Sequence, residues 1–186
     1  MESKILYFEK SGIANTDVTL RLARERAETL GIRQIVVASS HGYTAKRAHA
    51  IFAGLDVQII AVTICGGFQK EGWVMTPDER AALEALGVTV LTSLHALGDD
   101  VSDAFAGNPP NKIVRETLYR FCQGMKVAVE VALMAADADL LDMSREIIAV
   151  AGTGEGADTA LVLKPAYARK FKQLEIREIL AKPREA

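Results

Sequence analysis

Two loops rich in glycine and hydroxyl-bearing residues carry the clearest chemistry in this 186-residue chain. The first has the sequence Ser39-Ser40-His41-Gly42-Tyr43-Thr44, and the second has the sequence Gly152-Thr153-Gly154-Glu155-Gly156-Ala157-Asp158-Thr159. Hydroxyl groups donate hydrogen bonds, and glycine lets backbone amides approach a ligand closely. Both loops are therefore candidate binding sites for an anion such as a phosphate group.

The elements around the first loop favour phosphate binding. An apolar run at residues 34–38 predicts a buried strand before the loop, and the pattern at residues 44–53 predicts a helix after it. This order directs the free amides of a helix N-terminus at the loop, where the helix dipole also favours negative charge. The expected phosphate donors are the amides of Gly42, Tyr43 and Thr44 and the hydroxyls of Ser39, Ser40 and Thr44.

The second loop joins two β-prone runs, at residues 146–151 and 159–163. A dinucleotide-binding fingerprint needs its glycines to open a helix, so this loop does not predict a Rossmann fold. Its three glycines allow the backbone to approach a ligand, and Thr153, Asp158 and Thr159 add hydroxyl or carboxylate contacts. An ordinary glycine-rich hairpin is the alternative.

The rest of the chain alternates strands and helices without a linker, which predicts one α/β domain over residues 1–186. The run at residues 57–64 is almost entirely apolar, as strands buried in a parallel sheet are. A helix is expected from Asn15 and Thr16 to Gly31, and a capping box at residues 76–79 predicts another that closes at Gly87. The other expected strands are residues 5–8, 88–91 and 175–181, and the other expected helices are residues 95–106, 112–122 and 125–136.

Ligands of open α/β sheets bind beyond the carboxyl ends of the parallel strands. The segments 8–16, 38–44, 63–68 and 92–95 all begin at such ends, so we expect them to converge on one site. His95 could face a ligand there as a proton donor, although a surface histidine is the commoner case. Ser39, Ser40 and His41 do not predict a hydrolase, because adjacent side chains rarely aim at one another and no nucleophile elbow surrounds either serine.

Glu130 is an acidic residue within the strongly apolar helix expected at residues 125–136. A buried carboxylate needs a hydrogen-bonding partner. Lys126, one turn earlier, offers an ion pair at the helix surface that is worth about 0.2 to 0.5 kcal/mol. The functional alternative is that Glu130 bonds the ligand or the second loop.

Composition limits the partners and the compartment. The chain has 22 Lys+Arg and 24 Asp+Glu residues and a net charge of -2, so no overall field attracts it to nucleic acid or to an anionic membrane. Two cysteines, and three histidines without metal-ligand spacing, predict neither a disulfide framework nor a metal site. The sequence shows no signal-peptide core and no uncharged run of membrane-spanning length, so we expect a cytoplasmic protein.

The two loops and their flanking strands resemble the C-terminal domain of pyruvate kinase. Residues 35–48 and 59–63 are similar to the part that holds the phosphate end of the fructose bisphosphate effector, and residues 150–159 are similar to the glycine loop that closes over it. Nearly the whole chain resembles a family of stand-alone pyruvate kinase α/β-domain-like proteins. The further matches are Tyr7-Phe8, Asn15-Thr16, Gly67-Phe68, Ser93-Leu94-His95-Ala96-Leu97, Lys126-Val127-Ala128-Val129-Glu130, Met134-Ala135-Ala136-Asp137-Ala138 and Gly156-Ala157-Asp158-Thr159-Ala160-Leu161-Val162.

The resemblance implies a three-layer α/β/α fold with a mixed, mainly parallel sheet. It also implies FMN as the ligand, because members of the stand-alone family have been seen with FMN bound. Phosphoryl transfer from phosphoenolpyruvate is not implied, because the kinase active site lies in a barrel domain outside this similarity. The effector loop of pyruvate kinase commonly carries a strong cation where this chain has His41, so bisphosphate binding is not expected.

For FMN, Asn15 and Thr16 are expected to bond the ribityl hydroxyls, while Phe68 and the second loop line the ring; Asn15 is also a good helix cap, and Phe68 is equally suited to the core. A flavin-dependent oxidoreductase or carrier is one function class, and a non-catalytic sensor of a phosphorylated metabolite or sugar phosphate is the other. The apolar helices of the second half leave room for a homo-oligomer. The expected ligand contacts are Asn15, Thr16, Ser39, Ser40, His41, Gly42, Tyr43, Thr44, Thr63, Gly67, Phe68, His95, Glu130, Gly152, Thr153, Gly156, Ala157, Asp158 and Thr159.

Overall fold

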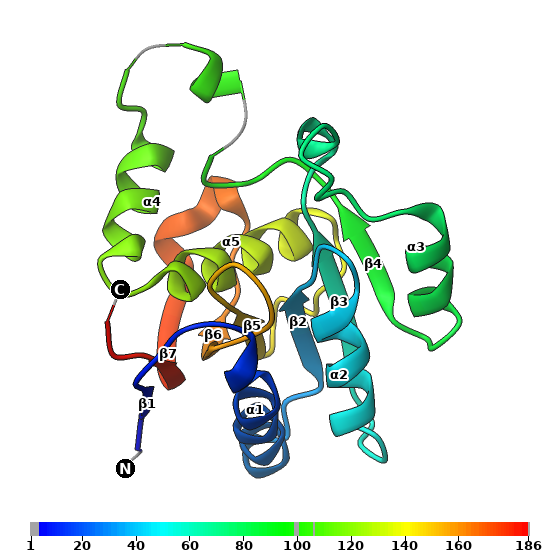
Figure 1. Ribbon diagram of the computed structural model, residues 1–186. Helices are drawn as coiled ribbons and strands as arrows, with labels where there is room; N and C mark the ends of the chain where they lie inside the picture. Colours follow the sequence, from blue (N-terminus) through cyan, green and yellow to red (C-terminus); the bar gives the residue numbers. More distant parts are fainter. Residues whose placement is uncertain (1–3, 99–100, 106, 186) are drawn as a thin grey trace.

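The structure, a computed structural model, describes residues 4–98, 101–105 and 107–185. Its centre is a seven-stranded sheet with the strand order β1-β7-β6-β5-β2-β3-β4 (Figure 1). The strands are β1 (Leu6–Phe8), β2 (Gln34–Ala38), β3 (Gln58–Thr63), β4 (Thr89–Thr92), β5 (Ile147–Ala151), β6 (Thr159–Lys164) and β7 (Glu175–Pro183).

The sheet is mixed and mainly parallel, which confirms the expected fold class. Four neighbouring pairs are parallel: β1 with β7, β5 with β2, β2 with β3, and β3 with β4. Only β6 runs in the other direction, antiparallel to both β5 and β7. The carboxyl ends of every strand except β6 therefore lie at one edge of the sheet, and the loops that follow those strands meet there.

Helices cover both faces of the sheet and complete the three layers (Figure 1). One face carries α1 (Thr16–Leu30), α2 (Tyr43–Ile51) and α3 (Pro77–Glu84), and the other carries α4 (Pro110–Tyr119) and α5 (Gln123–Asp137). Successive strand residues point to opposite faces. Ile35 and Val37 of β2 accordingly join the core beneath α1 and α2, whereas Val36 joins the core beneath α5.

Helix α5 lies almost completely inside the protein. Every residue from 124 to 136 except Val127 is buried, as expected for a helix that is apolar on nearly all sides. The Cys122 sulfur caps it by accepting a hydrogen bond from the Met125 amide at 3.3 Å. The helix therefore forms both a large part of the core and a rigid wall beside the carboxyl edge of the sheet.

The prediction of a helix at residues 95–106 is wrong for the described part of that segment. Only a short 3-10 helix, η3 (Val101–Ala104), is found, and residues 99, 100 and 106 lie outside the described residues. The apolar residues there share no single buried face, because Leu97 is 4% exposed whereas Val101 and Phe105 are 73% and 72% exposed. Burial of a common apolar stripe, which stabilises most helices in proteins, is missing.

No helix within residues 4–98, 101–105 and 107–185 is long and apolar enough to cross a membrane. In the same described ranges, no three His, Cys, Asp or Glu residues are placed to hold a metal ion together. Cys65 and Cys122 are free and buried, and they form no disulfide with each other.

Candidate ligand-binding cavity

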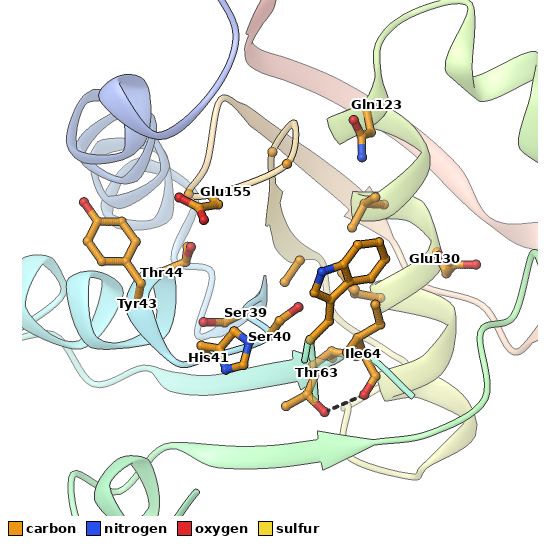
Figure 2. A pocket seen from close by; sticks show the side chains of 18 of the residues that line it. Ser39, Ser40, His41, Tyr43, Thr44, Thr63, Ile64, Gln123, Glu130 and Glu155 are labelled. Carbon is orange, nitrogen blue, oxygen red and sulfur yellow. Dashed lines mark hydrogen bonds between the residues drawn. The ribbon is translucent and has the colours of Figure 1, made fainter. Parts of the chain in front are cut away.

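A cavity of about 570 Å³ lies at the carboxyl edge of the sheet (Figure 2). The loops after β1, β2, β3, β4 and β5 all contribute to it, which is the convergence expected from the strand ends, and α5 closes one side. Cavities of about 300 to 1,000 Å³ are typical of small-molecule sites. The volume therefore suits a ligand the size of a cofactor.

Eleven of the expected ligand contacts line the cavity and eight do not. Those that line it are Ser39, Ser40, His41, Tyr43, Thr44, Thr63, Phe68, His95, Glu130, Gly152 and Gly156. Those outside its lining are Asn15, Thr16, Gly42, Gly67, Thr153, Ala157, Asp158 and Thr159. The structure thus brings the first loop, the aromatic residues and the tip of the glycine loop together. Most residues of the second group form hydrogen bonds within the protein instead.

The first loop ends in a helix N-terminus with accessible amides. Gly42 is the N-cap of α2 with a φ of 84°, a left-handed conformation that glycine adopts without strain. The Ser39 hydroxyl accepts a hydrogen bond from the Ala45 amide at 3.2 Å. For the amides of Gly42, Tyr43 and Thr44, no acceptor is found among the residues that the structure describes. These three amides remain available to an anion.

His41 is held at the rim of this loop by two acceptors. Its Nδ1 lies 3.2 Å from a Glu79 carboxylate oxygen, and its Nε2 lies 3.1 Å from the Gly72 carbonyl oxygen. A neutral imidazole donates only one hydrogen bond, whereas an imidazolium donates two. Both ring nitrogens therefore face an acceptor, and these two contacts fix the ring at the rim beside the α2 N-terminus.

The capping box of α3 fixes Glu79 and gives a testable pH dependence. The Thr76 amide donates a hydrogen bond to the Glu79 carboxylate at 2.8 Å. This bond is the main cause that holds the pKa of Glu79 below its usual value of 4.5, with smaller contributions from His41 and the Thr76 hydroxyl. Burial acts in the opposite direction and raises the pKa. A lowered carboxyl pKa adds stability that is complete above about pH 4.5 and is lost as the pH falls through the lowered pKa. We expect Glu79→Gln to lower the melting temperature by about 1 to 4 °C at about pH 6, and by less at about pH 3.

Glu84→Gln is the matched control for that experiment, because Glu84 lies in the same helix and forms only an exposed pair with Arg80 at 3.4 Å. It should leave the melting temperature at about pH 6 nearly unchanged. Equal losses for Glu79→Gln at both pH values would show that the carboxylate interactions of Glu79 do not stabilise the fold.

Aromatic rings form a second, chemically different part of the cavity. The Phe68 ring stacks on Trp73 with centroids 5.5 Å apart and on His95 with centroids 6.0 Å apart. Trp73 remains 51% exposed, so this stack of three rings is not buried in the core. Thr63, beneath it, is already engaged, since its hydroxyl lies 2.6 Å from that of Thr92 and donates to the Ile64 carbonyl at 3.3 Å (Figure 2).

One face of α5 forms the opposite wall. Its lining residues follow the i, i+3, i+4 spacing of a single helical face. They are Gln123, Lys126, Val127, Glu130, Val131 and Met134. Of these six residues, only Glu130 was among the expected ligand contacts. The other five lie on the same helical face as Glu130, so the i, i+3, i+4 spacing in the sequence could have indicated them. Trp73, Ile13 and Glu155 were also missed, although each lies in a loop expected near the site.

The Glu130 pair is internal, so the expectation of an ion pair at the helix surface is wrong. Lys126 Nζ lies 2.5 Å from one Glu130 oxygen, and the two side chains are 5% and 4% exposed. The other Glu130 oxygen accepts a hydrogen bond from the Leu97 amide at 2.9 Å. Glu130 therefore bonds both Lys126 and the loop after β4, and among the described residues no bond from Glu130 to the glycine loop is found.

Asp158 and Thr16 hold the loops in place and lie outside the cavity lining. Asp158 is fully buried and accepts hydrogen bonds from the amides of Gly12 at 2.8 Å and Thr153 at 3.2 Å, and from the Thr159 hydroxyl at 2.9 Å. The Thr16 hydroxyl accepts from the Ala157 amide at 3.0 Å. These contacts join the segment after β1 to the glycine loop.

Asn15 neither lines the cavity nor caps α1 with its side chain, because its amide nitrogen donates to the Lys10 carbonyl at 2.7 Å. The residue thus stabilises the turn that precedes α1. Both roles proposed from its type, a ribityl contact and a side-chain cap, are replaced by this local bond.

The fold and the site together define an α/β domain whose mixed sheet carries a small-molecule cavity at its carboxyl edge. The sequence matches the family "Pyruvate kinase, alpha/beta domain" over residues 17–163. The chain belongs to this family.

The chain is also similar to solved pyruvate kinases from Cryptosporidium parvum. One shares 15% identity with a TM-score of 0.44 over 84% of this chain and 24% of that chain. Another, in complex with ADP, shares 16% identity with a TM-score of 0.40 over 94% of this chain and 25% of that chain. This chain thus spans about a quarter of the length of these kinases.

Proposed function

We propose that the cavity binds FMN, with its phosphate on the loop at residues 39–44 and its ring against the aromatic residues. The observation that carries this proposal is that one cavity combines free helix N-terminal amides with a stacked aromatic column. A phosphate needs the first, and a flat apolar ring needs the second. Bound FMN would supply redox chemistry, which defines the possible role as a flavin-dependent oxidoreductase or carrier.

The phosphate end is held by dipoles and a histidine more than by fixed cations. The α2 dipole contributes about 0.3 to 1 kcal/mol, and hydrogen bonds to a charged group contribute about 1.5 to 3 kcal/mol each. The His41 ring lies at the rim, between Glu79 and the Gly72 carbonyl. The ring end offers the exposed face of the Phe68–Trp73 stack and the apolar residues Val127 and Val131 of α5.

Trp73 gives a direct test, because it is the only tryptophan in the chain and it lines the cavity. We expect FMN added to the protein freed of bound flavin to quench tryptophan fluorescence with a one-to-one endpoint. Riboflavin, which lacks the phosphate, should bind at least about 10-fold more weakly, since each lost charge-assisted hydrogen bond is worth about 1.5 to 3 kcal/mol. Absorbance of freshly purified protein, with mass spectrometry of what denaturation releases, provides an independent readout.

The proposal fails if no flavin co-purifies and FMN quenches Trp73 no more strongly than it quenches free tryptophan. Displacement of FMN by a sugar phosphate, together with absent turnover of photoreduced protein with electron acceptors, would favour the second function class. In that class the cavity serves as a non-catalytic sensor of a phosphorylated metabolite.

A further inference from the structure

The Lys126–Glu130 pair occupies a position that fold stability does not explain. Lys126 is the fourth residue of α5, close to the positive end of the helix dipole, where a cation is disfavoured. The order of lysine before glutamate is the weaker orientation of an i,i+4 pair. Apolar residues of similar volume commonly replace a buried ion pair with no loss of stability. Attraction within the pair is therefore a weak reason for its place in the fold.

The cavity wall of α5 shows where that pair acts. Along its lining face, Val127, Val131 and Met134 are apolar, whereas Gln123, Lys126 and Glu130 are polar. In Figure 2, Glu130 lies on the side of α5 that faces away from the loop carrying Ser39 and Ser40. A polar margin thus borders an apolar wall, on the side remote from the proposed phosphate position.

Lys126 lines the cavity and retains hydrogen-bonding capacity. An ammonium group has three N–H donors. One is directed to Glu130, and the Tyr119 ring, whose centroid lies 5.8 Å from Nζ, takes up a second by a cation–π contact. Among the described residues, no third acceptor for Nζ is found. Glu130 cannot turn away, because the Leu97 amide holds its other oxygen.

We propose that Lys126 recognises an electronegative edge of the ligand's ring system, and that Glu130 is the positioning residue that aims it. This inference rests on the proposed function, and it adds a ring-edge contact to the phosphate contact. The ligand class is a phosphorylated planar ring with carbonyl or ring-nitrogen acceptors along one edge, which the flavin ring of FMN supplies.

The test uses a charge-balanced double variant, Lys126→Met with Glu130→Gln. Methionine keeps the length of the lysine stem, and glutamine keeps an acceptor for the Leu97 amide, so the fold should survive. Affinities for FMN and riboflavin are measured by Trp73 quenching. We expect both to fall by the same factor, about 10- to 100-fold, because both ligands share the ring and the lost bond is charge-assisted. Lys126→Gln, whose amide still donates to Glu130, is a second variant with the same expected direction.

The matched control is Lys164→Met with Glu175→Gln, which makes identical substitutions in an exposed pair whose atoms are 2.8 Å apart. It should leave both affinities unchanged. Unchanged affinities in the folded Lys126 variants, or a loss confined to FMN, would overturn the ring-edge contact while leaving FMN binding intact. Absence of FMN binding to the unmodified protein would instead overturn the proposed function, and this inference with it.

Discussion

Replacing Asp158 with alanine is expected to lower the free energy of unfolding by about 3 to 5 kcal/mol. Asp158 is fully buried, and its carboxylate accepts hydrogen bonds from Gly12, Thr153 and Thr159. Alanine would leave the buried Thr159 hydroxyl and the half-buried amides of Gly12 and Thr153 without this acceptor, and an unsatisfied buried donor is costly. Urea unfolding measures the loss directly, and the melting temperature should fall by about 6 to 20 °C.

Two further results would separate this role from general damage. Asp56→Ala removes a carboxylate whose side chain is 89% exposed and pairs with Arg33, so its effect should stay below about 1 kcal/mol. Amide hydrogen exchange in Asp158→Ala should accelerate first at Gly12 and Thr153, since these lose their acceptor. A loss of stability no larger than that of Asp56→Ala would contradict the role of Asp158 in joining the loops.

The part of the fold that depends on local patterns was predictable. The apolar runs of β2 and β3, the capping box at Thr76 and the glycine stop at Gly31 all appear where the sequence places them. The loop at residues 39–44 lies between β2 and α2 as expected for the same reason, because strand, loop and helix are adjacent in the chain. Features of this kind need no knowledge of distant contacts.

The rest of the site depends on packing between distant segments. Lys126 and Trp73 meet the same cavity only because α5 covers one face of the sheet and the loop after β3 folds over its edge. Conversely, Asp158 and Thr16 carry residue types suited to a ligand, but the segment after β1 packs against the glycine loop and engages both of them. Residue type alone does not distinguish a ligand contact from a bond between loops.

Replacing Gly42 with valine is expected to lower the affinity for FMN by about 10- to 100-fold while changing that for riboflavin by less than about threefold. Gly42 has a φ of 84°, which a β-branched residue adopts only with strain, and a Cβ there would lie 3.3 Å from Leu83 Cδ1. We expect this backbone strain to shift the loop and, with it, the amides of Tyr43 and Thr44. In the proposed binding mode, only a ligand that carries a phosphate uses those amides.

Gly54→Val is the matched control, because Gly54 has a φ of 85° and a Cβ there would meet nothing within 4 Å. It introduces the same backbone strain outside the cavity lining, so it should reduce stability without changing the ratio of the two flavin affinities. The ratio of FMN affinity to riboflavin affinity thus separates the two ends of the site. Gly42→Val should lower this ratio, whereas the Lys126 variants should leave it unchanged. If the Gly42 variant binds FMN as tightly as the unmodified protein, the proposed position of the phosphate at the α2 N-terminus is wrong.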